Sequence, residues 1–255
     1  MPILSVHLTP ALVGPVDLAD RLVVVIDILR ATTTMLYALA EGASVIIPVA
    51  EVDEASDLAS RLPDTTVLLA GERKGSPIAG FDLGNSPKEF TASIVADKAI
   101  VFTTTNGTRA ILHAGLARRV LLGAFVNFSA VCHELLADGG DVSLLCAGTD
   151  GAVALEDTLF AGAVVEFLQN RGDYLLDDGA RLAWDTFEGH GSVLLSAFEV
   201  AAGGKNLAEI GLNEDLSWAA KIDRFGILAE VKGTPPRISI CSYSASPTVW
   251  RTCGP

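Results

Sequence analysis

One sequence pattern occurs twice in this chain: an apolar strand that leads directly into a threonine-rich helix start. Residues 23–34 read VVVIDILRATTT, and residues 99–110 read AIVFTTTNGTRA. Segments typical of a helix, a strand, a second helix and a third strand follow each, and equivalent positions are 75 to 77 residues apart. A unit of this length is too long for a solenoid repeat and favours duplication of half a domain. Chance similarity is the alternative, because all βαβ units share a period.

The alternation of strand and helix patterns indicates an α/β fold. Strands separated by helices form βαβ crossovers, which produce a largely parallel sheet. Hydrophobic residues make up 50% of the chain, as expected for parallel strands that are covered on both faces. We therefore expect a three-layer α/β/α architecture with two similar halves and mostly parallel or mixed sheets. The expected organisation is a first α/β half at 1–77, a glycine-rich connecting loop and helix at 78–98, a second α/β half with C-terminal helices at 99–232, and a tail extension at 233–255.

Charge and composition exclude several classes of partner. The formal net charge of −13 repels polyanions, which excludes nucleic acid and anionic membranes as partners. No apolar run reaches membrane-spanning length, and the N-terminus has no signal-peptide pattern. The four cysteines lack metal-ligand spacing, so we expect a reduced, cytoplasmic protein. A homo-oligomer is compatible with the sequence, which does not define the oligomeric state.

The segment between the two repeats, residues 71–89, combines glycines with charged residues. Its first part leaves a strand with Glu72 and Arg73 exposed, and loops at the carboxyl ends of strands are where open α/β sheets bind ligands. In its second part, Ser86 and Glu89 fit the two ends of a helix capping box. A simple linker is the alternative, but a linker has no need of a defined helix start.

Five short motifs and one acidic pair have a common family resemblance. They are DILRATTT at 27–34, AGER at 70–73, GFDLGNSP at 80–87, TTNGTR at 104–109, CAG at 146–148 and the pair Glu156-Asp157. In this order they resemble the motif set of the 2-phosphosulfolactate phosphatases, over roughly residues 1–232. That family hydrolyses the phosphate monoester of 2-phospho-3-sulfolactate to 3-sulfolactate and phosphate, in a magnesium-dependent step of coenzyme M biosynthesis. The resemblance implies a Mg²⁺-dependent phosphatase for a small polyanionic phospho-acid.

Carboxylates at strand ends are the candidates for a metal site. Hydrolysis of a phosphate monoester needs charge neutralisation and an in-line nucleophile, and Mg²⁺ takes oxygen ligands, among them a few protein carboxylates. Asp27, Glu72 and either Glu156 or Asp157 follow strands whose ends this topology brings to one edge. Of these we expect Asp27, Glu72 and Asp157 to bind Mg²⁺, with helix capping or a surface salt bridge as the alternative for each. Asp82 is a weaker candidate, because it can also form an Asx turn.

Arginines and hydroxyl-bearing residues are the candidates for substrate binding. An arginine holds phosphate, sulfonate or carboxylate through paired hydrogen bonds. We expect Arg109 to bind the phosphate, and Arg30 and Arg73 to divide the sulfonate and the carboxylate between them. The expected catalytic residues are Asp27, Glu72 and Arg109, and the expected substrate-binding residues are Arg30, Arg73, Asn85, Thr104, Thr105, Asn106, Gly107 and Thr108. For the threonines, β-propensity and helix capping are the alternative explanation.

The sequence leaves the nucleophile and the substrate open. Cys146 follows a strand, but it lacks the Cys-x5-Arg loop of cysteine phosphatases, since the residue six positions on is Ala152. We therefore expect a buried cysteine and attack by metal-activated water. The alternative functions are a phosphatase for another small phospho-acid on the same scaffold, and a non-catalytic anion-binding protein.

Overall fold

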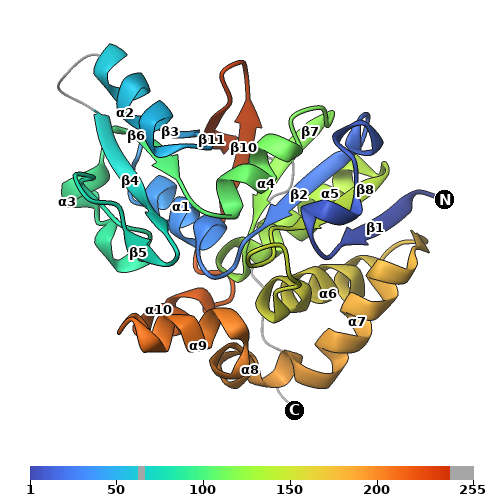
Figure 1. The fold of residues 1–255 in the computed structure, drawn as a ribbon. Coiled ribbons are helices and arrows are strands. Elements are labelled where there is room, and N and C mark those ends of the chain that lie inside the picture. Colours follow the sequence, from blue (N-terminus) through green and yellow to red (C-terminus); the bar gives the residue numbers. More distant parts are fainter. Residues whose placement is uncertain (63–66, 242–255) are drawn as a thin grey trace.

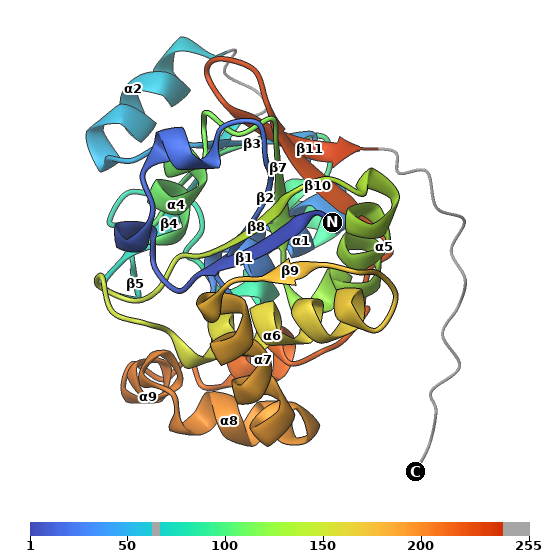
Figure 2. The ribbon, with the colours of Figure 1, turned by 90° about the vertical axis from the view of Figure 1, so that its right-hand side faces the viewer.

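The computed structural model describes residues 1–62 and 67–241 (Figures 1 and 2). The strands of these two segments form one 11-stranded sheet with the order β5-β4-β6-β3-β11-β10-β7-β2-β8-β1-β9. They are β1 (Ile3–His7), β2 (Leu22–Ile26), β3 (Val45–Pro48), β4 (Val67–Arg73), β5 (Ser76–Pro77), β6 (Ala99–Thr103), β7 (Arg119–Gly123), β8 (Val142–Cys146), β9 (Leu175–Leu176), β10 (Leu228–Lys232) and β11 (Arg237–Cys241). The α-helices are α1 (Ala31–Ala40), α2 (Val52–Arg61), α3 (Ala92–Val95), α4 (Gly107–His113), α5 (Phe128–Asp138), α6 (Leu155–Gln169), α7 (Asp178–His190), α8 (Leu194–Val200), α9 (Ala202–Glu209) and α10 (Glu214–Ala219).

Two groups of parallel strands make up most of the sheet. β4, β6 and β3 form one group, and β7, β2, β8, β1 and β9 form the other. The antiparallel hairpin of β10 and β11 lies between the groups, with β11 next to β3 and β10 next to β7. The expected α/β class and the expected mixed, mostly parallel sheet are confirmed. The similarity of the two halves stays a prediction.

The centre of the sheet is apolar on both faces. Every residue of β2 and of β8 is buried, which explains why these strands read as continuous apolar runs rather than as alternating ones. α6 packs against β8 and β2 of the sheet and against α7, which itself contacts β1, and α6 is buried almost throughout its length. Gly162 permits this packing, because a Cβ at that position would clash with the Ala183 carbonyl of α7.

Part of the expected tail belongs to the sheet. Residues 237–241 form β11, and Ile238 is fully buried between β3 and β10. The turn at 233–236 joins β11 to β10. The remainder of the expected tail, 242–255, lies outside the described residues.

The expected capping box at Ser86 and Glu89 is wrong. Pro87–Glu89 form only a 3₁₀ turn, and the Ser86 side chain does not cap it. The Glu89 carboxylate accepts a hydrogen bond from Gly84 N at 2.7 Å instead. The Ser86 hydroxyl donates to Asp215, so a tertiary partner replaces the local one.

Helices α8, α9 and α10 pack together at one end of the molecule (Figure 1). This end is where the carboxyl ends of β2 and β4 lie, so these helices are placed to cover the loops that follow the strands. Within residues 1–62 and 67–241, no helix combines the length and apolar character needed to span a bilayer.

Candidate active site

The first repeated segment places Asp27 at the carboxyl end of β2, directly before α1. The Asp27 carboxylate accepts a hydrogen bond from Ala31 N at 3.1 Å, so it contacts the first turn of α1. Asp27 N donates to the Thr32 hydroxyl at 3.0 Å. The first threonine of the motif therefore fixes the loop that carries Asp27.

The second repeated segment meets the first at this point. Thr104 N donates to the Thr108 hydroxyl at 3.1 Å, which fixes the loop between β6 and α4 as Thr32 fixes the first loop. Gly107 begins α4, and a Cβ there would clash with both Ala31 and the Asp27 carboxylate. The absence of a side chain at residue 107 therefore lets the starts of α1 and α4 meet around Asp27.

Glu72, at the carboxyl end of β4, connects these loops to a third one. Its carboxylate accepts hydrogen bonds from Thr105 N at 2.7 Å and from Gly75 N at 2.6 Å. Both Glu72 and Asp27 are buried. The ends of β2, β4 and β6 are thus joined at one place, although β2 belongs to the group of strands that runs antiparallel to β4 and β6 across the β10–β11 hairpin.

A cleft opens over these strand ends. Of the predicted site residues it is lined by Asp27, Arg30, Glu72, Asn85, Thr105 and Asn106. Further lining residues, which the sequence analysis did not single out, are Leu29, Lys74, Gly75, Thr149, Asp150, Gly203, Asn206 and Leu207. The last three lie in α9. Asn206 and Leu207 belong to the string GKNL at 204–207, which fits the family resemblance, but nothing local to this string places it at the cleft.

Buried carboxylates give the cleft an unusual electrostatic character. The pKa of Asp27 is raised to about 7, first by burial and further by the Glu72 and Glu156 carboxylates, against a lowering by the hydrogen bond from Ala31 N. Burial also raises the pKa of Glu156, which is 1% exposed. Glu156 Oε2 has no hydrogen-bond partner among the described residues. Such a cluster is favourable only when protonated or when a cation is bound.

The Asp157 carboxylate accepts hydrogen bonds from the backbone of two loops. One carboxylate oxygen accepts from Ile28 N at 2.8 Å and the other from Gly148 N at 3.0 Å. Both oxygens are therefore engaged, and Asp157 does not line the cleft. In the described part of the chain, no three His, Cys, Asp or Glu side chains are arranged around a common metal position. The structure thus does not assemble Asp27, Glu72 and Asp157 into one set of ligands.

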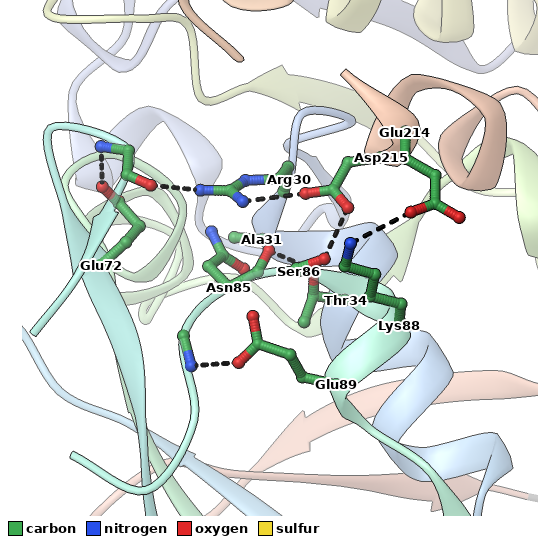
Figure 3. Close-up of polar contacts among 12 residues, drawn as sticks. Arg30, Ala31, Thr34, Glu72, Asn85, Ser86, Lys88, Glu89, Glu214 and Asp215 are labelled. Carbon is green, nitrogen blue, oxygen red and sulfur yellow. Dashed lines mark hydrogen bonds and ion pairs between the residues drawn. The ribbon is translucent and has the colours of Figure 1, made fainter. Parts of the chain in front are cut away.

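The three arginines have different surroundings. Arg30 is buried and donates to Asp215 at 2.9 Å and to Gly75 O at 2.7 Å (Figure 3). Arg73 donates to Ala50 O, Glu72 O and the Thr103 hydroxyl and does not line the cleft. Arg109 is exposed, pairs with Glu51 at 3.0 Å and lines a neighbouring depression. Of the three, the structure brings only Arg30 to the cleft.

Several other predicted residues lie behind the cleft wall. Thr104 and Thr108 are buried and bond to each other, and Gly107 is in contact with Ala31 and Asp27. Cys146 is fully buried, and burial raises its pKa well above the ordinary value, with a further rise from Asp157. A thiol in this environment stays protonated, which disfavours it as a nucleophile.

Taken together, this fold and cleft define an α/β enzyme with a buried acidic site at the carboxyl ends of its strands. Comparison with known proteins gives the family. Residues 7–234 match the family model described as 2-phosphosulpholactate phosphatase. The chain belongs to this family and is a phosphatase.

Curated relatives agree with the family match. A protein of Caldanaerobacter subterraneus is 39% identical over 223 residues, which cover 88% of this chain and 92% of the relative. One of Symbiobacterium thermophilum is 40% identical over 213 residues, covering 83% and 91%. One of Deinococcus radiodurans is 44% identical over 200 residues, covering 78% and 82%. Each of these relatives is named a probable 2-phosphosulfolactate phosphatase.

Proposed function

We propose that this protein hydrolyses the phosphate monoester of 2-phospho-3-sulfolactate to 3-sulfolactate and phosphate in a Mg²⁺-dependent reaction. The family and the names of the relatives support the substrate. The observation that carries the metal requirement is the buried cluster of Asp27, Glu72 and Glu156 beside the cleft. A bound cation would offset the charge of this cluster and let a polyanion approach it.

The cations of the cleft do not suffice for a substrate with three acidic groups. Arg30 and Lys74 line it, but the charge of Arg30 is already paired with Asp215. Asp27, Glu72 and Asp150 line the same cleft. The cleft lining is therefore acidic. A divalent cation that offsets this negative charge is the simplest means by which the cleft can bind a phosphate ester.

Asp27 and Glu156 fit such an ion better than the predicted three-carboxylate set. Mg²⁺ keeps several waters and is bound by one or two carboxylates together with phosphate oxygens of the substrate. Asp27 lines the cleft. Glu156 lies behind the lining residue Gly203 and has an unpartnered oxygen, whereas both oxygens of Asp157 are engaged by backbone N–H groups. When bound, Mg²⁺ neutralises charge on the phosphoryl oxygens and polarises water.

Neighbouring side chains supply the remaining contacts. Asn106 Oδ1 accepts a hydrogen bond from Asp150 N, so the side-chain nitrogen of Asn106 can donate to a substrate oxygen. Asn85 lines the cleft with a buried Oδ1 that has no partner among the described residues, which suits it to accept from a bound water. Cys146 stays outside the cleft, and water is the nucleophile in this proposal.

We also infer that the cleft lies between duplicated units. In the proposed duplication, β2, β3 and β4 correspond to β6, β7 and β8. The strands β4-β6-β3 on one side of the β10–β11 hairpin then correspond in order to β8-β2-β7 on its other side, each group read from the outer edge inwards. The hydrogen bond from Asp27 N to Thr32 corresponds to that from Thr104 N to Thr108. Both observations support a pseudo-twofold relationship in which each unit contributes one helix start to the site.

Phosphate release from 2-phospho-3-sulfolactate tests the function. Turnover is expected with Mg²⁺, is expected to disappear after chelation, and is expected to return when Mg²⁺ is restored. Undiminished turnover in a metal-free preparation would contradict the metal requirement. Preference for another phospho-acid would favour the alternative function, a phosphatase of different specificity on the same scaffold. This alternative is tested because Arg73 and Arg109, which we expected to bind the substrate, do not line the cleft.

A further inference from the structure

Lys74 occupies a backbone conformation that suits few residues. β4 and β5 form a hairpin in which Arg73 pairs with Ser76, so Lys74 and Gly75 are its two loop residues. Both are left-handed, with φ of +52° for Lys74 and +82° for Gly75. A turn of this kind favours Asn, Asp or Gly at its first position, whereas the side chain of a lysine crowds the backbone there. Turn geometry therefore does not explain a lysine at residue 74.

The turn is fixed against the cleft through Gly75. Gly75 N donates to the Glu72 carboxylate, and Gly75 O accepts from the Arg30 guanidinium (Figure 3). A Cβ at residue 75 would lie 3.0 Å from Ile210 Cδ1 and 3.2 Å from Asn206 Nδ2. Hydrogen bonds on two sides and close packing on a third hold the turn in place, so residue 74 is held at the cleft as well.

The Lys74 side chain is available to a ligand. Lys74 lines the cleft and is exposed, and its backbone N–H donates to the Thr105 hydroxyl at 3.2 Å. Within residues 1–62 and 67–241 its ammonium group forms no ion pair. Arg30, the other cation of the lining, is paired with Asp215. Lys74 therefore supplies the uncompensated positive charge of the cleft lining.

We propose that Lys74 is a specificity-determining residue that binds the second anionic group of the substrate, its carboxylate or its sulfonate. This proposal rests on the function proposed above. The depth of the groups supports the assignment: Asp27 and Glu72 are buried at the bottom of the cleft, whereas Lys74 is exposed at its rim. A phosphoryl group held at the buried carboxylates through a cation leaves the other acidic groups of a small substrate near the rim.

Residue 74 can be substituted without destabilising the turn, because its left-handed conformation favours asparagine over lysine. Lys74→Asn removes the charge and installs a residue that the left-handed position favours, so the melting temperature is expected to equal or exceed that of the unchanged protein. Its KM for 2-phospho-3-sulfolactate is expected to rise about tenfold, the loss typical of a charge-assisted contact at a rim, with kcat within about twofold. Lys74→Gln is expected to show the same rise, and Lys74→Arg to avoid most of it.

Substrate analogues identify the group that is bound. 2-Phospholactate lacks the sulfonate, and 2-(phosphooxy)ethanesulfonate lacks the carboxylate. The effect of Lys74→Asn on KM is expected to vanish with the analogue that lacks the group bound by Lys74 and to persist with the other. Lys88→Gln, which removes a lysine that pairs with Glu214 away from the cleft lining, is the control and is expected to leave every KM unchanged. An unchanged KM in Lys74→Asn, or an equal loss with both analogues, would overturn the proposal.

Binding of the product separates this proposal from the proposed function. 3-Sulfolactate carries both the carboxylate and the sulfonate but no phosphate, and its binding can be measured by calorimetry without turnover. About tenfold weaker binding to Lys74→Asn than to the unchanged protein is expected. If the unchanged protein hydrolysed none of the three esters, the proposed function would fail, while this difference in binding would still uphold the role of Lys74. Equal binding to both proteins would overturn that role.

Discussion

The buried guanidinium of Arg30 forms an ion pair with Asp215 at 2.9 Å, with side-chain exposures of only 3% and 0% (Figure 3). Asp215 lies in the first turn of α10, whereas Arg30 directly precedes α1. The Ser86 hydroxyl donates to the second oxygen of Asp215, and Arg30 also donates to Gly75 O. One ion pair thus fastens the C-terminal helices to two of the loops that surround the cleft.

Loss of Asp215 is expected to destabilise the fold strongly. Asp215→Ala leaves the Arg30 charge buried without a partner, a change that typically costs about 3 to 5 kcal/mol of unfolding free energy. Glu214→Ala is the matched control on the same helix, because Glu214 pairs with Lys88 at the surface. Its expected cost is below about 1 kcal/mol. Urea unfolding of both variants measures the difference, and equal costs would contradict a structural role for the buried pair.

The sequence predicted the strand ends of the site better than the side chains that face it. Asp27, Glu72 and Thr105 were selected because each lies at the end of an apolar strand. Glu72 and Thr105 belong to the neighbouring parallel strands β4 and β6. β2, which precedes Asp27, runs antiparallel to these strands across the β10–β11 hairpin, so Asp27 meets them through the contact between the starts of α1 and α4 and not at a shared edge of parallel strands. Arg73 was misplaced for a reason that strand geometry supplies. It is the neighbour of Glu72 in β4, and successive residues of a strand point to opposite faces. With Glu72 at the cleft, the Arg73 side chain contacts Ala50 and Thr103 instead.

Long-range placement limited the rest of the prediction. The βαβ pattern was sufficient for a mostly parallel sheet, but nothing local to residues 237–241 indicates that this strand lies between β3 and β10. Asn206 and Leu207 belong to a string that fits the family resemblance, GKNL at 204–207, but they reach the cleft only because α9 packs over Gly75. Such contacts arise from tertiary packing between segments that are distant in the chain.

The raised pKa of Asp27 predicts how stability depends on pH in the absence of metal. Its folded-state pKa of about 7 exceeds the ordinary aspartate value of 3.8, so at pH values between the two the folded protein holds a proton that the unfolded chain has released. Stability from this group is full below about pH 4 and is lost as pH rises through 7. Chelated protein is therefore expected to melt at a lower temperature at pH 8 than at pH 5.

Two further measurements assign this effect to Asp27. Asp27→Asn lacks the titrating group and is expected to lose its contribution to the pH dependence. Added Mg²⁺, if it binds the charged carboxylate, is expected to raise the melting temperature at pH 8 more than at pH 5. An unchanged pH dependence in Asp27→Asn would show that other groups cause it.

Cys146→Ser is expected to retain substantial phosphatase activity. The thiol is fully buried with a raised pKa, and it does not line the cleft. The hydroxyl would occupy an apolar environment, so a loss of about 1 to 3 kcal/mol in stability is the main expected effect. Activity per folded molecule, measured below the melting transition, distinguishes the two effects. An inactive but folded and metal-binding variant would restore the cysteine as the nucleophile.

Gly107→Ala is expected to abolish activity by separating the two helix starts. The added Cβ would clash with Ala31 and with the Asp27 carboxylate, so α4 must move away from α1 or Asp27 must turn out of its position. Either movement displaces the carboxylate that we propose to hold the metal, and weaker Mg²⁺ binding is therefore expected together with the lost turnover. Overpacking of this kind typically costs about 1 to 3 kcal/mol of stability.

Gly189→Ala is the control for this substitution. Gly189 lies within α7, and a Cβ there would meet no atom within 4 Å. Alanine is the better helix former, so this variant is expected to gain about 0.5 to 1 kcal/mol and to keep full activity. Calorimetric Mg²⁺ binding and phosphate release in the two variants test whether the close contact at residue 107 is specific to the site. Normal metal binding and turnover in Gly107→Ala would show that the two helix starts tolerate separation, and that Asp27 does not depend on their contact.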